Sequence, residues 1–216
     1  DIGTSKVVCL IGSISDSQSI EIVAMGSYPS SGLKKGVVVN IDATTDAIQK
    51  SIEQAKNSFE GKIKNVFVGI AGNHIKSLNS HGIVGIKDKE VTQLDIEKVI
   101  DAAQAVAIPS DQRVLHVLPQ EFVIDDQDAI REPLGMSGVR LESHVHLVTC
   151  ANNAIQNIEK CVKRCGIGID GFVLEQLASS YSILSNDEKE LGVCIVDIGG
   201  GTTDIAIFNN LSLIHI

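Results

Sequence analysis

Two short segments near opposite ends of the chain contain residue types that can bind phosphate groups and the metal ions that accompany them. The first starts at Asp1 and reads Asp-Ile-Gly-Thr-Ser-Lys; the second starts at Asp197 and reads Asp-Ile-Gly-Gly-Gly-Thr-Thr-Asp. An apolar strand follows each segment, so both are typical of hairpin turns. Glycine in such a turn allows positive φ angles and close backbone approach. Successive amides in such turns bind anions, so the sequence predicts two phosphate-binding turns.

The Asp residues of these segments suit a metal ion better than a phosphate. An ionised carboxylate cannot donate a hydrogen bond to a phosphate oxygen, whereas hydrated Mg²⁺ is held by carboxylates. Two such turns facing each other would hold a polyphosphate and its metal between two lobes. A plain β-turn is the alternative for each segment. The second segment is the more specific, because consecutive glycines lie between its two Asp residues.

The bulk composition narrows the class of protein. The chain has 216 residues, 44% of them hydrophobic, and a formal net charge of −9. This length supports one large domain or two smaller ones, and the abundance of Val and Ile suits buried strands of an α/β fold. No basic cluster is interleaved with aromatic residues, which argues against nucleic-acid binding. No apolar run reaches the roughly 20 residues of a membrane span, and five cysteines without a Cys-x-x-Cys pair indicate free thiols.

The elements that must position the two turns can be predicted from hydrophobic periodicity. The first part of the chain predicts two paired strands, a helix with Asp42 as its N-cap, and a buried strand, at residues 7–12, 20–28, 43–59 and 66–71. From residue 73 to about 148 the pattern changes to strand, helix, strand and strand, which predicts a small α+β insertion with a long loop at 125–138. The first domain then resumes with a helix, a strand and a helix, at residues 152–165, 169–174 and 176–184, before a polar linker at 186–190.

The two Asp-Gly turns with this continuation resemble the actin-like ATPase superfamily, which implies an α/β fold of the actin-like (ribonuclease H-like) type. Four further segments are similar to the FtsA family of bacterial cell-division proteins: residues 114–122, 135–140, 177–182 and 190–194. The resemblance extends from Asp1 to about Phe208. It implies subdomain 1A over 1–72 and 149–185, an inserted subdomain 1C (an SHS2 domain) over 73–148, and the truncated start of subdomain 2A over 186–216. No counterpart of the strand Gly192–Val196 precedes Asp1, so we expect the chain to begin within the first hairpin.

The resemblance also implies ATP and Mg²⁺ as ligands and gives roles to individual residues. The phosphates are expected to contact a set of backbone and side-chain groups: Gly3, Thr4, Ser5, Lys6, Gly199, Gly200, Gly201, Thr202 and Thr203. Mg²⁺ is expected to bind through water to Asp1 and Asp197, with Asp204 in support. Glu175 and Gln176 stand where the superfamily has a residue that orients the attacking water, so they are the candidate catalytic residues of what is at most a weak ATPase.

An FtsA-like function implies an actin-like scaffold that self-associates into filaments at the cytoplasmic face of the inner membrane, at the division site. Its implied partners are the FtsZ ring, through a region outside this chain, and later division proteins such as FtsN, through the inserted subdomain. Membrane attachment would use a C-terminal helix that is also outside the chain. A sugar kinase of the same superfamily and a PilM-like pilus-assembly protein are the alternatives.

Overall fold

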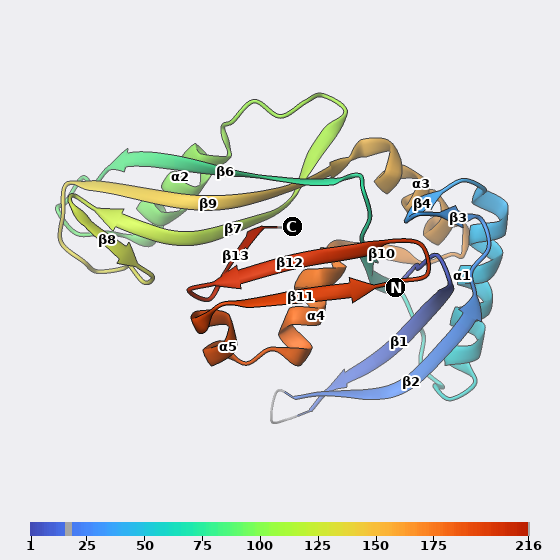
Figure 1. The fold of residues 1–216 in the computed structure, drawn as a ribbon. Coiled ribbons are helices and arrows are strands. Elements are labelled where there is room, and N and C mark those ends of the chain that lie inside the picture. Colours follow the sequence, from blue (N-terminus) through green and yellow to red (C-terminus); the bar gives the residue numbers. More distant parts are fainter. Residues whose placement is uncertain (16–18, 216) are drawn as a thin grey trace. The chain divides into compact units, whose positions relative to one another are not determined.

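The computed structural model describes residues 1–15 and 19–215, and the chain folds into two compact units (Figure 1). The first unit comprises residues 1–74, 151–180 and 196–204. The second comprises residues 75–150, 181–195 and 205–216. Each unit combines strands with helices, so the predicted α/β class is confirmed.

A hairpin covered by a helix begins the first unit. Strands β1 (Lys6–Ile14) and β2 (Ile20–Pro29) pair antiparallel, and helix α1 (Ile41–Lys56) packs on one face of the pair through apolar residues such as Ile48 and Ile52. A Cβ atom on Gly26 would lie 1.9 Å from the carbonyl oxygen of Ser51, so only glycine lets helix and strand approach this closely.

A second, parallel strand pair completes the unit. Strands β5 (Asn65–Ile70) and β10 (Gly168–Leu174) pair in parallel. Helix α3 (Asn152–Arg164) packs against α1 and β10, and helix α4 (Glu175–Ile183) starts directly where β10 ends. The short strands β3 (Leu33–Lys34) and β4 (Val37–Val38) form a separate hairpin.

The second unit is built on a four-stranded sheet of order β6-β9-β7-β8. Its strands are β6 (Ile75–Gly85), β7 (Gln112–Ile124), β8 (Gln127–Ile130) and β9 (Arg140–Ala151). Helix α2 (Gln93–Gln104) packs against β6, where a Cβ atom on Gly82 would meet the Val99 carbonyl oxygen at 2.2 Å. The core below the helix contains Val91, Val99, Phe122, Ile124 and Leu141.

The last elements are helix α5 (Asn186–Leu191) and a three-stranded sheet of order β11-β12-β13. The strands are β11 (Val193–Ile198), β12 (Thr203–Asn209) and β13 (Ser212–His215). The boundary between the two compact units crosses the β11–β12 hairpin, and the tip of this hairpin, residues 196–204, belongs to the first unit. Within the described residues, no helix is long and apolar enough to cross a membrane.

Three local predictions were wrong, each for a hydrogen-bonding reason. The N-cap of α1 is Asn40, whose side-chain oxygen accepts the Ala43 amide, and Asp42 lies within the first turn of the helix. The supposed linker after Ser185 is helix α5, because Ser185 and Glu188 form a capping box. The loop predicted at 125–138 contains strand β8, which pairs with β7.

Candidate functional site

The first glycine turn is a tight hairpin tip. The main-chain nitrogen of Asp1 donates to the Val8 carbonyl oxygen at 3.0 Å, and the Val8 amide donates back to the Asp1 carbonyl oxygen at 2.9 Å. Inside this pair, the Gly3 amide donates to the carbonyl oxygen of Lys6 at 3.0 Å. The turn therefore closes on itself and leads directly into β1.

The second glycine turn has the same internal hydrogen bond. The Gly199 amide donates to the Thr202 carbonyl oxygen at 2.9 Å, and Gly199 follows Asp197 at the spacing by which Gly3 follows Asp1. The amides of Gly3 and Gly199 are thus used within their own turns. The amides of Thr4, Ser5 and Gly200 take no part in these turn hydrogen bonds, so they can donate to a bound anion.

The two turns face each other at close range. A Cβ atom on Gly200 would lie 2.6 Å from the Cβ atom of Ser5, and one on Gly201 would lie 2.7 Å from the Cγ2 atom of Thr4. The glycines of the two turns do not use the positive φ that glycine allows; in the described part of the chain the positive-φ glycines are Gly32, Gly36, Gly72, Gly135, Gly166 and Gly192. The glycines of the two turns are needed for close approach.

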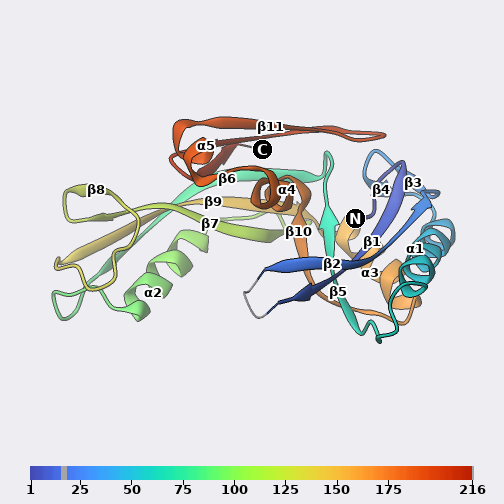
Figure 2. The same ribbon diagram turned by 90° about the horizontal axis from the view of Figure 1, so that it is seen from below.

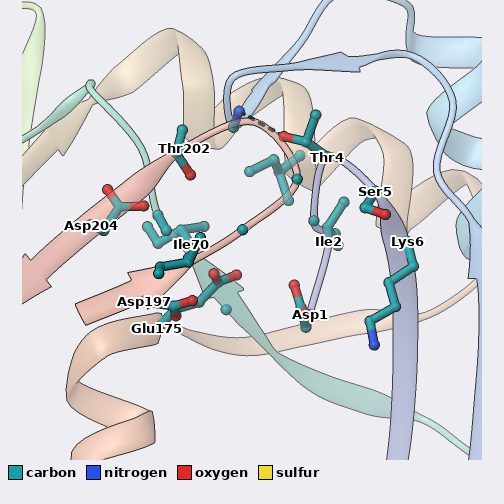
Figure 3. Close-up of a pocket in the computed structure, with 18 residues that line it drawn as sticks. Asp1, Ile2, Thr4, Ser5, Lys6, Ile70, Glu175, Asp197, Thr202 and Asp204 are labelled. Carbon is teal, nitrogen blue, oxygen red and sulfur yellow. Dashed lines mark hydrogen bonds between the residues drawn. The ribbon is translucent and has the colours of Figure 1, made fainter. Parts of the chain in front are cut away.

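A pocket of about 230 Å³ opens between the turns (Figure 3). Most of the predicted site residues line it: Asp1, Gly3, Thr4, Ser5, Lys6, Glu175, Asp197, Gly199, Gly200, Thr202 and Asp204. Asp1 and Lys6 come from the first turn, Asp197 and Asp204 from the ends of β11 and β12, and Glu175 from the start of α4. The side chain of Lys6 extends away from the second turn in Figure 3.

Three predicted residues do not line the pocket. Gly201 packs against Thr4 instead, and Thr203 lies on the exposed surface at the start of β12. Gln176 is 1% exposed, and its amide nitrogen has no hydrogen-bond partner among the described residues. Of the two candidate catalytic residues, only Glu175 reaches the pocket.

Burial and neighbouring charges perturb the carboxyl group of Glu175. Burial raises its pKa, and the negative charges of Asp197 and Asp204 raise it further. A Cβ atom on Gly69 would come within 3.1 Å of the Glu175 Oε1 atom, so the glycine in β5 makes room for this side chain. The result is a carboxyl group that holds a proton at higher pH than usual.

Sequence reasoning missed several residues of this site. Gly36, Gly69 and Ala71 line the pocket, and the Gly36 amide donates to the Thr4 hydroxyl oxygen at 3.2 Å. His74 lies close enough to Asp204 for that carboxylate to raise its pKa, but burial has the larger effect and lowers it. A glycine inside an apolar strand signals close approach, so Gly69 could have been found from the sequence. Gly36 and His74 carried no comparable signal.

The chemistry of the lining suits a phosphate group and a hard cation. The unused amides can donate to anionic oxygens, and the carboxylates of Asp1, Asp197 and Asp204 are the oxygen ligands that Mg²⁺ prefers. The described residues contain no group of three or more His, Cys, Asp or Glu side chains that could hold a metal ion directly.

Comparison with known proteins supports a specific family. Residues 72–149 match the family model described as the SHS2 domain inserted in FTSA. The whole chain aligns with the cell division protein FtsA of Pseudomonas aeruginosa at 65% identity over 215 residues. The corresponding proteins of Neisseria meningitidis and Escherichia coli K12 are 53% and 45% identical over the same length. The chain spans about half of these relatives, 52%, 52% and 51% of their lengths.

A solved structure supports the fold. The chain is similar to a chain of the PilM-PilN type IV pilus biogenesis complex with a TM-score of 0.69 and 14% identity, over 99% of this chain and 58% of that one. At this identity the likeness concerns the fold alone. It supports the actin-like fold predicted from the two turns.

Proposed function

The predicted resemblance to FtsA is confirmed over the whole chain, and on that premise we propose that this is part of an actin-like cell-division protein that binds ATP and Mg²⁺. The observation that carries the proposal is the meeting of two glycine turns and three Asp side chains in one pocket. A nucleotide's phosphates need amide donors and a divalent cation in the same place. The chain supplies the amide donors and the carboxylates that would hold the cation, from segments near its two ends.

We assign roles to the pocket residues as follows. The amides of Thr4, Ser5 and Gly200 donate to phosphate oxygens, and Asp1 and Asp197 hold Mg²⁺ through water, with Asp204 in support. Lys6 adds positive charge at the rim. The bound cation would neutralise charge on the phosphates, which is the chemistry that it supplies in phosphoryl transfer.

Glu175 is proposed to orient a water molecule at the open side of the pocket. Because burial and two neighbouring carboxylates raise its pKa, it accepts a proton more readily than an exposed Glu. Gln176 is buried and does not line the pocket, so we propose no catalytic role for it. Catalysis by one such residue is consistent with slow ATP hydrolysis at most.

We further propose the subdivision of FtsA-like proteins for this chain: subdomain 1A over 1–72 and 149–185, subdomain 1C over 73–148, and the start of 2A over 186–216. The whole protein would form filaments at the cytoplasmic face of the inner membrane at the division site. There it would tether the FtsZ ring through regions outside this chain and recruit later division proteins such as FtsN through 1C.

The experiment that tests the proposal uses the whole protein and its Asp197→Asn variant. We expect Mg²⁺-dependent binding of a fluorescent ATP analogue, weakened at least about tenfold in the variant, because a carboxylate ligand to the cation's water shell is lost. A pull-down with an FtsZ tail peptide tests the division role. Phosphoryl transfer to a sugar panel without FtsZ binding would overturn the scaffold proposal in favour of a sugar kinase, and unchanged ATP binding in the variant would remove Asp197 from the site.

A further inference from the structure

Two histidines lie directly opposite each other on neighbouring strands of the second unit. His81 of β6 and His144 of β9 are register partners in this antiparallel pair. Their rings lie edge to face, with centroids 6.4 Å apart and planes at 84°. Figure 2 shows β6, β9 and β7 side by side, with α2 on one face of the sheet. Opposed side chains of a strand pair project from the same face, so both imidazoles belong to one surface.

The histidine pair lies on the face of the sheet away from α2. A Cβ atom on Gly82 would meet the Val99 carbonyl oxygen of α2 at 2.2 Å, so Gly82 faces the helix. Successive residues of a strand point to opposite faces, which places His81 on the other face. His81 is exposed, and the side chain of His144 is 43% exposed, so a solvated ion can reach both rings.

Glu121 of β7 fixes the orientation of the His144 ring. Its Oε1 atom lies 2.9 Å from the His144 Nδ1 atom. An ionised carboxylate only accepts hydrogen bonds, so the Nδ1 atom carries the proton, and the Nε2 atom of the neutral ring keeps its lone pair. A carboxylate on the far nitrogen is the usual second partner of a histidine that binds a metal ion. Glu121 therefore prepares His144 to act as a ligand through Nε2.

His146 shows a different use of a histidine on the same strand. It lies two residues after His144, opposite Asn79, and is 2% exposed. Its Nδ1 atom lies 2.6 Å from the Oδ1 atom of Asn79, so this ring is a buried side chain with an amide partner. The His81–His144 pair differs in two properties that a metal site needs, because solvent reaches it and a second imidazole faces the first.

We propose that His81 and His144 bind one transition-metal ion of the Zn²⁺ class. Imidazole nitrogen is a preferred ligand of Zn²⁺, Cu²⁺ and Ni²⁺. The described residues contain no group of three or more side chains that could hold a metal ion, so the ion would have two protein ligands and complete its shell with water. Zn–N bonds of about 2.0 Å bring two ligating rings to within about 5–6 Å of each other. Rotation of the exposed His81 side chain closes the remaining gap.

The bound ion would fasten the edge of the sheet. In the described part of the chain, β6 is an edge strand whose neighbour in the sheet is β9, and the ion would join these two strands through their side chains. A ligand that binds the folded sheet and not the unfolded chain stabilises the fold. The site lies within the second unit, whereas the residues that line the proposed nucleotide pocket belong to the first, so the two proposals are independent.

The test titrates Zn²⁺ into the whole protein, purified without an affinity tag and kept in excess Mg²⁺ without nucleotide, and measures binding by calorimetry. Glu121→Gln should weaken binding about tenfold, as the loss of a carboxylate behind a ligating histidine does. His81→Ala and His144→Ala should each weaken it further. Ring ¹⁵N NMR separates positioning from ligation: Zn²⁺ should shift the Nε2 resonance of His144 while its Nδ1 atom keeps the proton.

Ile83→Thr is the matched control, because Ile83 is 51% exposed and lies two residues from His81 on the same face of β6. It should bind Zn²⁺ as the parent protein does, and an equal loss in this variant would show that binding does not depend on the imidazoles.

Three further results would overturn the proposal. Binding that is unchanged in both histidine variants would assign the ion to other groups, such as the exposed thiol of Cys194. A loss in only one histidine variant would show that the two rings do not share an ion. Binding only at millimolar Zn²⁺ would show a nonspecific surface association.

Discussion

The two glycine turns close with the same hydrogen bond but carry different side chains at their tips. In the first, Gly3 bonds to Lys6 across Thr4 and Ser5; in the second, Gly199 bonds to Thr202 across Gly200 and Gly201. The side chains of Thr4 and Ser5 occupy the space that Cβ atoms on Gly201 and Gly200 would need. The two turns are therefore complementary in shape. The second turn has only glycines at its tip, and it fits against the side chains at the tip of the first.

The comparison shows that the glycines of such a turn can be required by a facing turn and not by their own backbone angles. None of these glycines has a positive φ. The charges differ as well, since the second turn brings Asp197 and Asp204 to the pocket, whereas the first brings Asp1 and Lys6. Substitutions in the two turns and at Glu175 test how the shapes and charges of the turns differ.

The largest effect is expected from Gly200→Ala. The new Cβ atom would lie 2.6 Å from the Cβ atom of Ser5, so one turn must move, at a cost of about 2 kcal/mol in the free energy of unfolding. Urea unfolding measures the loss. Gly85→Ala is the matched control, because its nearest contact would be at 4.0 Å. Adding Ser5→Gly to Gly200→Ala should restore part of the stability, and no rescue would mean that the turns do not meet through these two residues.

A smaller effect is expected from Glu175→Gln, which removes a negative charge near the second turn. Burial raises the pKa of Glu175 in the folded protein, so ionising it destabilises the fold above that pKa, and this cost disappears as the pH falls below the unfolded value near 4.5. The variant should be more stable than the parent by about 1 kcal/mol at pH 8 and equal to it at pH 4. Thermal unfolding at both pH values measures this, and a variant less stable at pH 8 would contradict it.

Thr4→Val tests the side chain that the first turn has and the second lacks. The substitution removes the hydroxyl that accepts the Gly36 amide at 3.2 Å but keeps the shape that packs on Gly201. We expect a loss of about 1 kcal/mol, measured by urea unfolding. Thr4→Ser, which keeps the acceptor, should lose less; if both variants lose equally, packing and not the hydrogen bond fixes Thr4.

The smallest difference is expected between Gly3→Ala and Gly199→Ala, which alter the equivalent position of each turn. The added Cβ atom would lie 3.0 Å from the Lys6 carbonyl oxygen in the first turn and 3.3 Å from the Thr202 carbonyl oxygen in the second. Gly3→Ala should therefore be the more destabilising, by about 0.5 kcal/mol. If parallel urea titrations found Gly199→Ala to be the more destabilising variant, the first turn would accommodate an added Cβ atom more easily than the second.

Some local features could be predicted, because they depend on neighbouring residues. The helix expected within residues 73–148 is α2, which begins at a capping box formed by Thr92 and Asp95. The same signal was present at Ser185 and Glu188 and was overlooked, so helix α5 was mistaken for a linker. Asn40 was missed as the N-cap of α1 because Asp42, two residues later, has the same capping chemistry.

The residue types and spacing along the chain were sufficient to identify both turns, because each is closed by a hydrogen bond between residues three apart. Folding alone decided that these turns face each other and that Glu175 and Gly69 meet beside them. The tertiary structure also shows that the turn glycines have no positive φ angles and are required because the two turns approach each other closely. The reason is physical: a turn's hydrogen bond is local, whereas the room around it depends on side chains that distant strands carry to the same place.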